Sequence, residues 1–251
     1  MNRLLTASTL ALSLALAAPA TASDLTALSD SERDAFRDEV RAYLLENPEV
    51  LMEAIAVLEE RQAAAQEEND VALIATNAKD IFNDGYSHVT GNPEGDVTVV
   101  EFIDYRCGYC RKAFPELQSL IAADGNIKVI YKEFPILGEQ STLAARFALA
   151  TQIALGEAAY GKLHDAIMGM RGNITLESLG ALADSLSLNT SAILAALSDP
   201  KIDQIIGANY SLAQRLQISG TPSFVIENEM LRGYLPAADL AEIVERIRAE
   251  K

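Results

Sequence analysis

Two cysteines set the strongest limit on how this chain can fold. Cys107 and Cys110 are its only cysteines among 251 residues, and two residues separate them. A bridge that closes so short a loop removes little entropy from the unfolded chain, so a purely stabilising disulfide is not expected. The pair directly follows an apolar run, residues 97–103, and precedes a helical pattern. The sequence therefore predicts a buried strand, a Cys-Gly-Tyr-Cys turn and a helix in direct succession.

The first residues have the pattern of a signal peptide. Asn2 and Arg3 form a short positive region, residues 4–18 are apolar, and Ala20-Thr21-Ala22 is a cleavage site of small residues. We expect residues 1–22 to be removed, with cleavage near Ala22, and the protein to reach the periplasm, where disulfides form and persist. A retained anchor is the alternative, but the apolar stretch is shorter than the ~20 residues that span a bilayer.

The chain is strongly acidic. Its 36 acidic residues outnumber 20 basic ones and give a formal net charge of -16. Phosphate backbones and anionic lipid surfaces would be repelled, so no nucleic-acid partner is expected. The simplest role of this acidity is to keep an exported protein soluble.

Residues 23–90 predict a helical oligomerisation arm and a linker. A helix is expected over residues 31–46, Asn47-Pro48 interrupts it, and a second helix follows. Residues 59–70 keep high helix propensity without an apolar stripe, which indicates a helical or fraying linker. The two helices share one apolar stripe, made of Phe36, Val40, Tyr43, Leu44, Leu51, Ile55 and Leu58. Because so few apolar residues cannot build a core, we expect this stripe to pack on copies of itself; packing on the chain's own main domain is the alternative.

Residues 91–251 predict an α/β domain. Strands are expected over residues 97–103, 127–134, 223–226 and 230–234, and helices over residues 107–122 and 237–250. The stretch from 143 to 215 is almost wholly helical in pattern, with breaks near Gly156, Gly172 and Asp199-Pro200. This order implies a mixed sheet covered by helices.

The position of Cys107 predicts a reactive thiol. At the start of a helix, unpaired backbone N–H groups and the positive end of the helix dipole favour an anion such as a thiolate. The pKa of Cys107 should therefore be lowered, which makes it the nucleophile. Cys110 lies one turn later on the same face and can resolve a mixed disulfide by attacking it.

Metal binding is the alternative use of such a pair. Zinc would need two further ligands, and the two histidines of the chain, His88 and His164, lie in different segments. Copper(I) suits two thiolates and remains a secondary hypothesis. We expect no metal and no organic cofactor, since two thiols suffice for disulfide exchange.

Glu101 is the one charged residue of the first predicted strand. It lies six residues before Cys107, on the face opposite to Val100 and Phe102. A buried carboxylate is costly without a partner or a task, so we interpret Glu101 as a proton acceptor for Cys110. An exposed position at a sheet edge is the alternative.

Thr221-Pro222 precedes the strand expected at 223–226, where proline marks a strand start or a cis turn. Earlier in the chain, a strand, the Cys-x-x-Cys motif and a helix follow one another, and a long helical block comes after them. Together with Thr221-Pro222, this order resembles the DsbA family of periplasmic thiol-disulfide oxidoreductases over residues 92–250. The resemblance implies an α/β thioredoxin fold with an inserted helical subdomain at about 138–216, preceded by an α-helical N-terminal arm. It also implies that residues 91–251 form the DsbA-like domain.

The resemblance assigns roles to individual residues. Cys107 would be the exposed nucleophile, Cys110 the resolving thiol and Glu101 the buried acid of the family. Pro222 would be cis and face the cysteine pair. Thr221 would offer its backbone to a substrate peptide.

Gly108 and Tyr109, between the cysteines, complete the expected substrate-binding set. DsbA itself has Pro-His at these positions and valine in place of Thr221. In this chain, Gly108-Tyr109 and Thr221 look like the corresponding residues of the isomerases DsbC and DsbG. Without a histidine between the cysteines, one source of thiolate stabilisation is missing.

Residues 41–51, Arg-Ala-Tyr-Leu-Leu-Glu-Asn-Pro-Glu-Val-Leu, resemble the oligomerisation segment of ScsC, the suppressor of copper sensitivity proteins. That resemblance implies a homo-oligomer, trimer or dimer, with disulfide isomerase or reductase activity. Its partners would be exported proteins with disulfides or free thiols, and a membrane redox partner. A DsbA-like oxidase and a copper(I)-binding or holdase protein are the alternatives.

Overall fold

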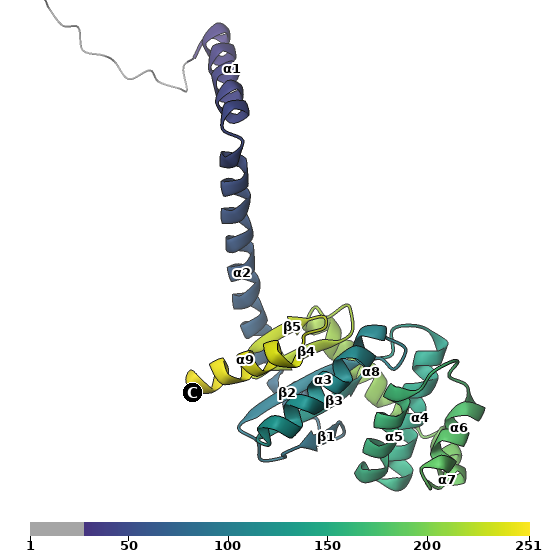
Figure 1. Ribbon diagram of the computed structural model, residues 1–251. Coiled ribbons are helices and arrows are strands. Elements are labelled where there is room, and N and C mark those ends of the chain that lie inside the picture. Colours follow the sequence, from purple (N-terminus) through teal and green to yellow (C-terminus); the bar gives the residue numbers. More distant parts are fainter. Residues whose placement is uncertain (1–27) are drawn as a thin grey trace, which may run out of the picture. The chain divides into compact units, whose positions relative to one another are not determined.

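The computed structural model describes residues 28–251 (Figure 1), so the predicted signal peptide lies outside the described residues. The chain divides into two compact units, with the boundary between Glu60 and Arg61. Within residues 28–251, no helix combines the length and apolar character that crossing a membrane requires.

The first unit holds α1 (Asp30–Glu46) and the beginning of α2 (Glu49–Phe82). Ser29 and Glu32 form a capping box that satisfies free N–H groups at the start of α1. The helix ends at Asn47, before Pro48, as the sequence predicts. In the described part of this unit the apolar stripe is largely exposed, for example Tyr43 at 54% and Leu58 at 54%.

The second predicted helix continues through the expected linker, whose helical alternative is the one present. α2 continues without a break for 34 residues, so the expected linker at 59–70 is regular helix. From Asp70 onward α2 buries one face, including Ile74 and Ile81. The high helix propensity of residues 59–70 agrees with this continuous helix, and the packing from Asp70 onward anchors its C-terminal part. The boundary expected at residue 90 therefore falls inside the second unit.

A five-stranded mixed sheet forms the centre of the second unit, in the order β1-β3-β2-β4-β5. The central pair, β2 and β3, is parallel, and the remaining pairs are antiparallel. The strands are β1 (His88–Gly91), β2 (Val97–Ile103), β3 (Ile127–Glu133), β4 (Ser223–Ile226) and β5 (Glu229–Arg232). The sequence analysis missed β1 because its four residues have no apolar run, and only pairing with β3 defines it as a strand.

Helices cover both faces of this sheet. On one face, Val99 and Ile103 pack with α3 (Gly108–Asp124) and α9 (Ala237–Ala249). On the other, Val100 and Phe102 pack with residues of α2 and α8 (Pro200–Arg215). Figure 1 shows α3 and α9 running across the sheet.

The predicted helical block contains five helices. They are α4 (Glu139–Leu155), α5 (Glu157–Gly169), α6 (Leu176–Ser185), α7 (Thr190–Ala196) and α8. Figure 1 shows α4, α5, α6 and α7 gathered beside one end of the sheet. The three expected breaks are present, and the sequence analysis missed a fourth at 186–189. There Asn189 caps α7, with its side chain accepting a hydrogen bond from the Ala192 N–H.

Replacing Ile81 by alanine should test the anchoring of α2 on the sheet. Ile81 is completely buried, so Ile81→Ala should lower the free energy of unfolding by about 2–5 kcal/mol in urea denaturation. Val71→Ala, at a 39% exposed position of the same helix, is the matched control and should change it by less than about 0.5 kcal/mol. Equal effects of the two substitutions would contradict this packing.

Candidate active site

The turn that carries Cys107 is fixed by the side chain of Asp104. This buried carboxylate accepts hydrogen bonds from the N–H groups of Arg106 at 2.7 Å, Ile136 at 2.8 Å and Leu137 at 3.0 Å. The Cys107 N–H donates to the Asp104 carbonyl at 3.0 Å. Cys107 is thereby held as the N-cap of α3. The sequence analysis did not select Asp104, although an aspartate just after a strand is a common turn signal.

Both cysteines are thiols in this structure. Cys107 exposes 7% of its surface and Cys110 none. Cys107 is therefore the more accessible thiol, as expected, but it is not the exposed residue that the resemblance implied, because the Thr221 segment covers it. Gly108 and Tyr109 are exposed beside it, and Tyr109 is 63% accessible.

The surroundings of Cys107 stabilise a thiolate. A hydrogen bond from the Cys110 thiol contributes most, and the backbone N–H groups of Cys110 and Tyr109 add to it, so that the pKa of Cys107 is lowered to about 5. The same hydrogen bond, together with burial and the nearby Glu101 carboxylate, raises the pKa of Cys110. The two thiols thus differ as a nucleophile and a resolving thiol would.

The Thr221-Pro222 segment lies directly against the nucleophile. The Cys107 thiol donates to the Thr221 carbonyl at 3.1 Å, and a hydrogen bond with the Thr221 side chain helps to lower the pKa of Cys107. The Thr221-Pro222 peptide bond is cis, as the resemblance implied. A small cavity of about 160 Å³, lined by residues 219–223 with Arg232 and Gly233, opens beside this segment.

Glu101 is buried in the middle of the sheet, with 1% exposure. Its neighbours in register are Tyr131 on β3 and Phe224 on β4, so the sheet-edge alternative is wrong. Its Oε1 atom has no hydrogen-bond partner among the described residues. Burial, with a smaller effect of Cys107, raises the pKa of Glu101 to about 8. Such a carboxyl group changes its protonation state near neutral pH.

In the described part of the chain, neither histidine is hydrogen-bonded to a cysteine. His88 Nδ1 lies 2.6 Å from Glu157 and His164 Nδ1 lies 3.0 Å from the Tyr105 hydroxyl. Across residues 28–251, no three His, Cys, Asp or Glu side chains are grouped so as to hold a metal ion.

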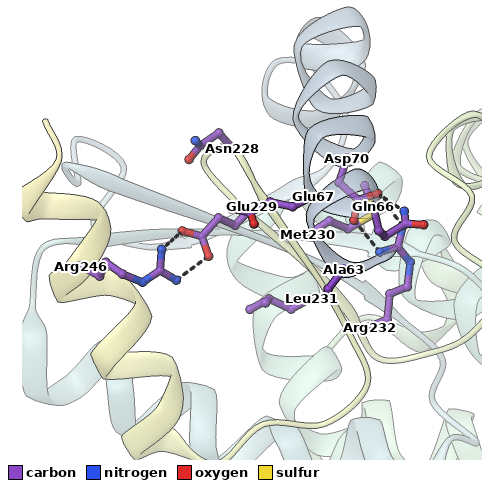
Figure 2. Close-up of a pocket in the computed structure, with 10 residues that line it drawn as sticks. All are labelled: Ala63, Gln66, Glu67, Asp70, Asn228, Glu229, Met230, Leu231, Arg232 and Arg246. Atoms are coloured by element: carbon purple, nitrogen blue, oxygen red, sulfur yellow. Dashed lines mark hydrogen bonds and ion pairs between the residues drawn. The ribbon is translucent and has the colours of Figure 1, made fainter. Parts of the chain in front are cut away.

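A larger cavity of about 540 Å³ lies between α2, β5 and α9 (Figure 2). Two bidentate ion pairs flank it, Arg232 with Asp70 and Arg246 with Glu229. None of its lining residues belongs to the predicted site. It therefore does not compete with the cysteine pair as the reactive centre.

A cysteine pair at a helix start, facing a proline loop on a mixed sheet, defines a protein of the thioredoxin-like oxidoreductase class. The DSBA-like thioredoxin domain model matches residues 98–245. Because this match covers more than half of the chain, the protein belongs to the DSBA-like thioredoxin domain family. The model of the copper resistance protein ScsC N-terminal domain matches residues 32–65, within the predicted arm.

Solved structures support the same assignment. A thioredoxin-like oxidoreductase from Silicibacter pomeroyi is 42% identical and has a TM-score of 0.65, over 68% of this chain and 97% of that chain. A linker-deletion mutant of Proteus mirabilis ScsC is 26% identical with a TM-score of 0.67, over 91% of this chain and 100% of that chain. These similarities confirm the predicted fold class and the two-part resemblance.

Parts of this chain are also similar to parts of curated proteins. Disulfide bond formation protein D of Bacillus subtilis is 26% identical over 174 residues, which are 64% of this chain and 76% of that protein. The Na(+)/H(+) antiporter NhaA 1 of Salinispora arenicola is 29% identical over 146 residues, 58% of this chain. The chain spans only 22% of the length of that antiporter.

Alkylation of the reduced protein at different pH values should report the Cys107 thiolate. Because the pKa of Cys107 is lowered to about 5, the labelling rate should be half-maximal near pH 5, level off above pH 6 and fall about tenfold per unit below pH 4. Cys110→Ser isolates the Cys107 signal, and Cys107→Ser shows the reactivity of Cys110 alone. Faster labelling of Cys110 than of Cys107 in the unaltered protein would contradict the assignment.

Proposed function

We propose that this protein is a periplasmic disulfide isomerase or reductase that acts on exported proteins through Cys107 and Cys110. The observation that carries the proposal is the pairing of an accessible, low-pKa thiol with a fully buried resolving thiol. The match of residues 32–65 to the ScsC N-terminal domain supports a separate role for the arm. A membrane redox partner would keep the pair reduced.

The reaction needs only the two sulfur atoms and one proton acceptor. The Cys107 thiolate attacks one sulfur of a client disulfide, forms a mixed disulfide and releases the other client sulfur as a thiolate. In isomerisation, a second client thiolate attacks the mixed disulfide, forms a new client disulfide and restores the Cys107 thiolate.

Reduction follows when Cys110 resolves the mixed disulfide instead. Cys110 must first lose its proton, and the nearby carboxylate of Glu101 is the acceptor we propose. The Cys110 thiolate then attacks Cys107, forms the Cys107–Cys110 disulfide and releases the client as a dithiol. The client thiolates take up one proton from Glu101 and one from the solvent, and no metal or organic cofactor enters either path.

Substrate binding is proposed for the residues that surround Cys107. Thr221 presents its backbone beside the thiol, and the small cavity next to Pro222 gives room for a client chain. Gly108 offers no side chain that would obstruct an approaching disulfide. Tyr109, largely exposed, provides an aromatic contact surface.

The arm is proposed to form a homo-oligomer, a trimer or a dimer. Its apolar stripe is exposed over two helices of the described chain, and each large apolar side chain that becomes buried stabilises association by roughly 1.5–3 kcal/mol. An oligomer holds several Cys107 sites near one client, which raises the effective concentration for repeated attack.

A disulfide oxidase is the second candidate, and the low pKa of Cys107 favours it. A stabilised thiolate makes the dithiol more stable than the disulfide, so the disulfide form becomes a stronger oxidant. The reduction potential against glutathione decides between the two directions. Copper(I) binding by the two thiols remains a third use of the same residues.

Refolding of a scrambled disulfide protein in glutathione buffer tests the activity. The unaltered protein should restore the native disulfides, and its rate should be unchanged by a metal chelator because the thiols carry the reaction. Cys107→Ser should reduce the rate to the background. Cys110→Ser, the matched control, should still form mixed disulfides and should accumulate them. Full activity of Cys107→Ser, or loss of activity with chelator, would overturn the proposal.

Removal of the residues before Arg61 tests the arm, because the second compact unit begins there. The truncated protein should be a folded monomer by light scattering and should reduce small disulfides at the rate of the full chain. It should isomerise scrambled proteins at least about tenfold more slowly, since the effective concentration from neighbouring sites is lost. A monomeric full-length protein, or undiminished isomerisation by the truncated form, would show that isomerisation does not depend on association through the arm.

A further inference from the structure

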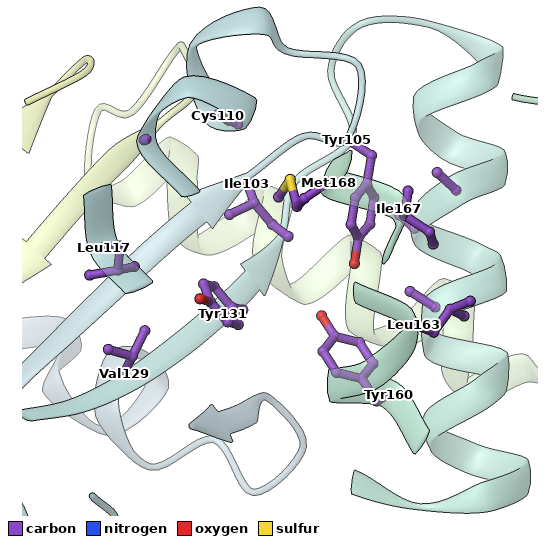
Figure 3. Packing of buried hydrophobic residues seen from close by; sticks show 14 of the residues in the cluster. Ile103, Tyr105, Cys110, Leu117, Val129, Tyr131, Tyr160, Leu163, Ile167 and Met168 are labelled. Atoms are coloured by element: carbon purple, nitrogen blue, oxygen red, sulfur yellow. The ribbon is translucent and has the colours of Figure 1, made fainter. Parts of the chain in front are cut away.

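Four buried side chains form a hydrogen-bonded cluster between the sheet and the helical insertion. They are Tyr105, Glu133, Tyr160 and His164, and we call them the Tyr105 cluster. Tyr105 and Tyr160 both donate to Glu133 Oε1, at 2.7 and 2.6 Å. All four side chains have at most 2% exposure. Figure 3 shows the hydroxyl groups of Tyr105 and Tyr160 pointing toward each other between β3 and α5.

The hydrogen bonds of the cluster have a defined direction. The Tyr105 hydroxyl has a single proton, which it donates to Glu133, so the 3.0 Å contact with His164 is an Nδ1–H donating to the Tyr105 oxygen. Burial lowers the pKa of His164 to about 3, which keeps the ring neutral and suits this arrangement. The cluster thus holds the Tyr105 ring in one position from two sides.

Tyr105 is also the residue through which this cluster reaches the cysteines. It lies two residues before Cys107 in the chain. Its backbone carbonyl accepts a hydrogen bond at 2.8 Å from Nε of Arg111, the residue after Cys110. Its side chain is therefore tied to β3 and α5, while its backbone is tied to the first turn of α3.

The polar groups of this cluster are not needed for packing alone. Phenylalanine at positions 105 and 160 would fill the same space without buried hydroxyl groups that require partners. The cluster even leaves Glu133 Oε2 and His164 Nε2 without a hydrogen-bond partner among residues 28–251. Buried polar groups kept at such a penalty point to a role in fixing one geometry.

We propose that Tyr105 is a positioning residue, which its hydrogen bonds with Glu133 and His164 hold so that Cys107 stays aligned with the N-terminal turn of α3. The thiolate depends on hydrogen bonds from Cys110 and from backbone N–H groups of that turn, and hydrogen bonds weaken steeply with misalignment. The helical insertion, through His164 of α5, thereby contributes to the reactivity of a cysteine on a different element.

A pair of matched substitutions tests this role. Tyr105→Phe and Tyr160→Phe each remove one buried hydroxyl that donates to the same oxygen, but only Tyr105 belongs to the redox turn. Both should lower the urea midpoint to a similar extent. Tyr105→Phe should raise the Cys107 pKa, measured by alkylation at different pH values, by roughly half a unit. The fraction of thiolate below pH 5 should then be about threefold lower. Tyr160→Phe should leave the Cys107 pKa unchanged.

A second pair covers the case in which Tyr105→Phe fails to fold. Glu133→Gln keeps the acceptor oxygen and should retain the Cys107 pKa, and Glu133→Met removes it and should raise the pKa as Tyr105→Phe does. Equal shifts for both tyrosine variants, or no shift for Tyr105→Phe, would show that the cluster is ordinary core. The inference rests on the proposed role of Cys107 only, and that role is tested separately by Cys107→Ser in the unaltered background.

Discussion

The chemistry of this protein depends on the first turn of α3, where backbone N–H groups without helical partners meet the Cys107 sulfur. A negative charge is stabilised there without any cationic side chain between the cysteines. The Cys110 thiol adds the largest contribution, and its own ionisation is suppressed by the same hydrogen bond. One geometric relation therefore separates the two thiols into an attacking and a resolving group.

Three buried acidic residues of the second unit lie around this turn. Asp104 holds the backbone before Cys107, Glu101 lies beneath the pair in the sheet, and Glu133 accepts from the Tyr105 hydroxyl. Buried polar groups are destabilising unless they are satisfied. Their grouping at one end of the β2–β3 pair indicates that stability is given up there for a fixed arrangement of the redox turn.

The first and the second unit differ in how far they bury their apolar side chains. The second unit covers both faces of its sheet with helices and buries an extended core. The described part of the first unit exposes its apolar side chains instead, and α1 has no buried residue. A helix of this kind is stable when something covers its apolar stripe, which is why we connect the arm with association of several chains.

The sequence by itself determined the elements with strong local signals and the reactive pair. Apolar runs predicted the bounds of β2, β3 and β4 to within one residue. The Cys-x-x-Cys motif at a helix start predicted the position of the reactive site. Both predictions depend only on local pattern and spacing. The short strand β1 and the anchoring of α2 depended on partners far away in the chain, namely β3 and the buried face of the sheet. Tyr105 and Glu133 likewise have no local signal for their role, whereas Asp104 has the local signal of a turn. Only the tertiary structure brought Thr221 onto the Cys107 sulfur and Tyr160 onto Glu133, because hydrogen bonds between distant segments are formed by the packing of the sheet and the helical insertion.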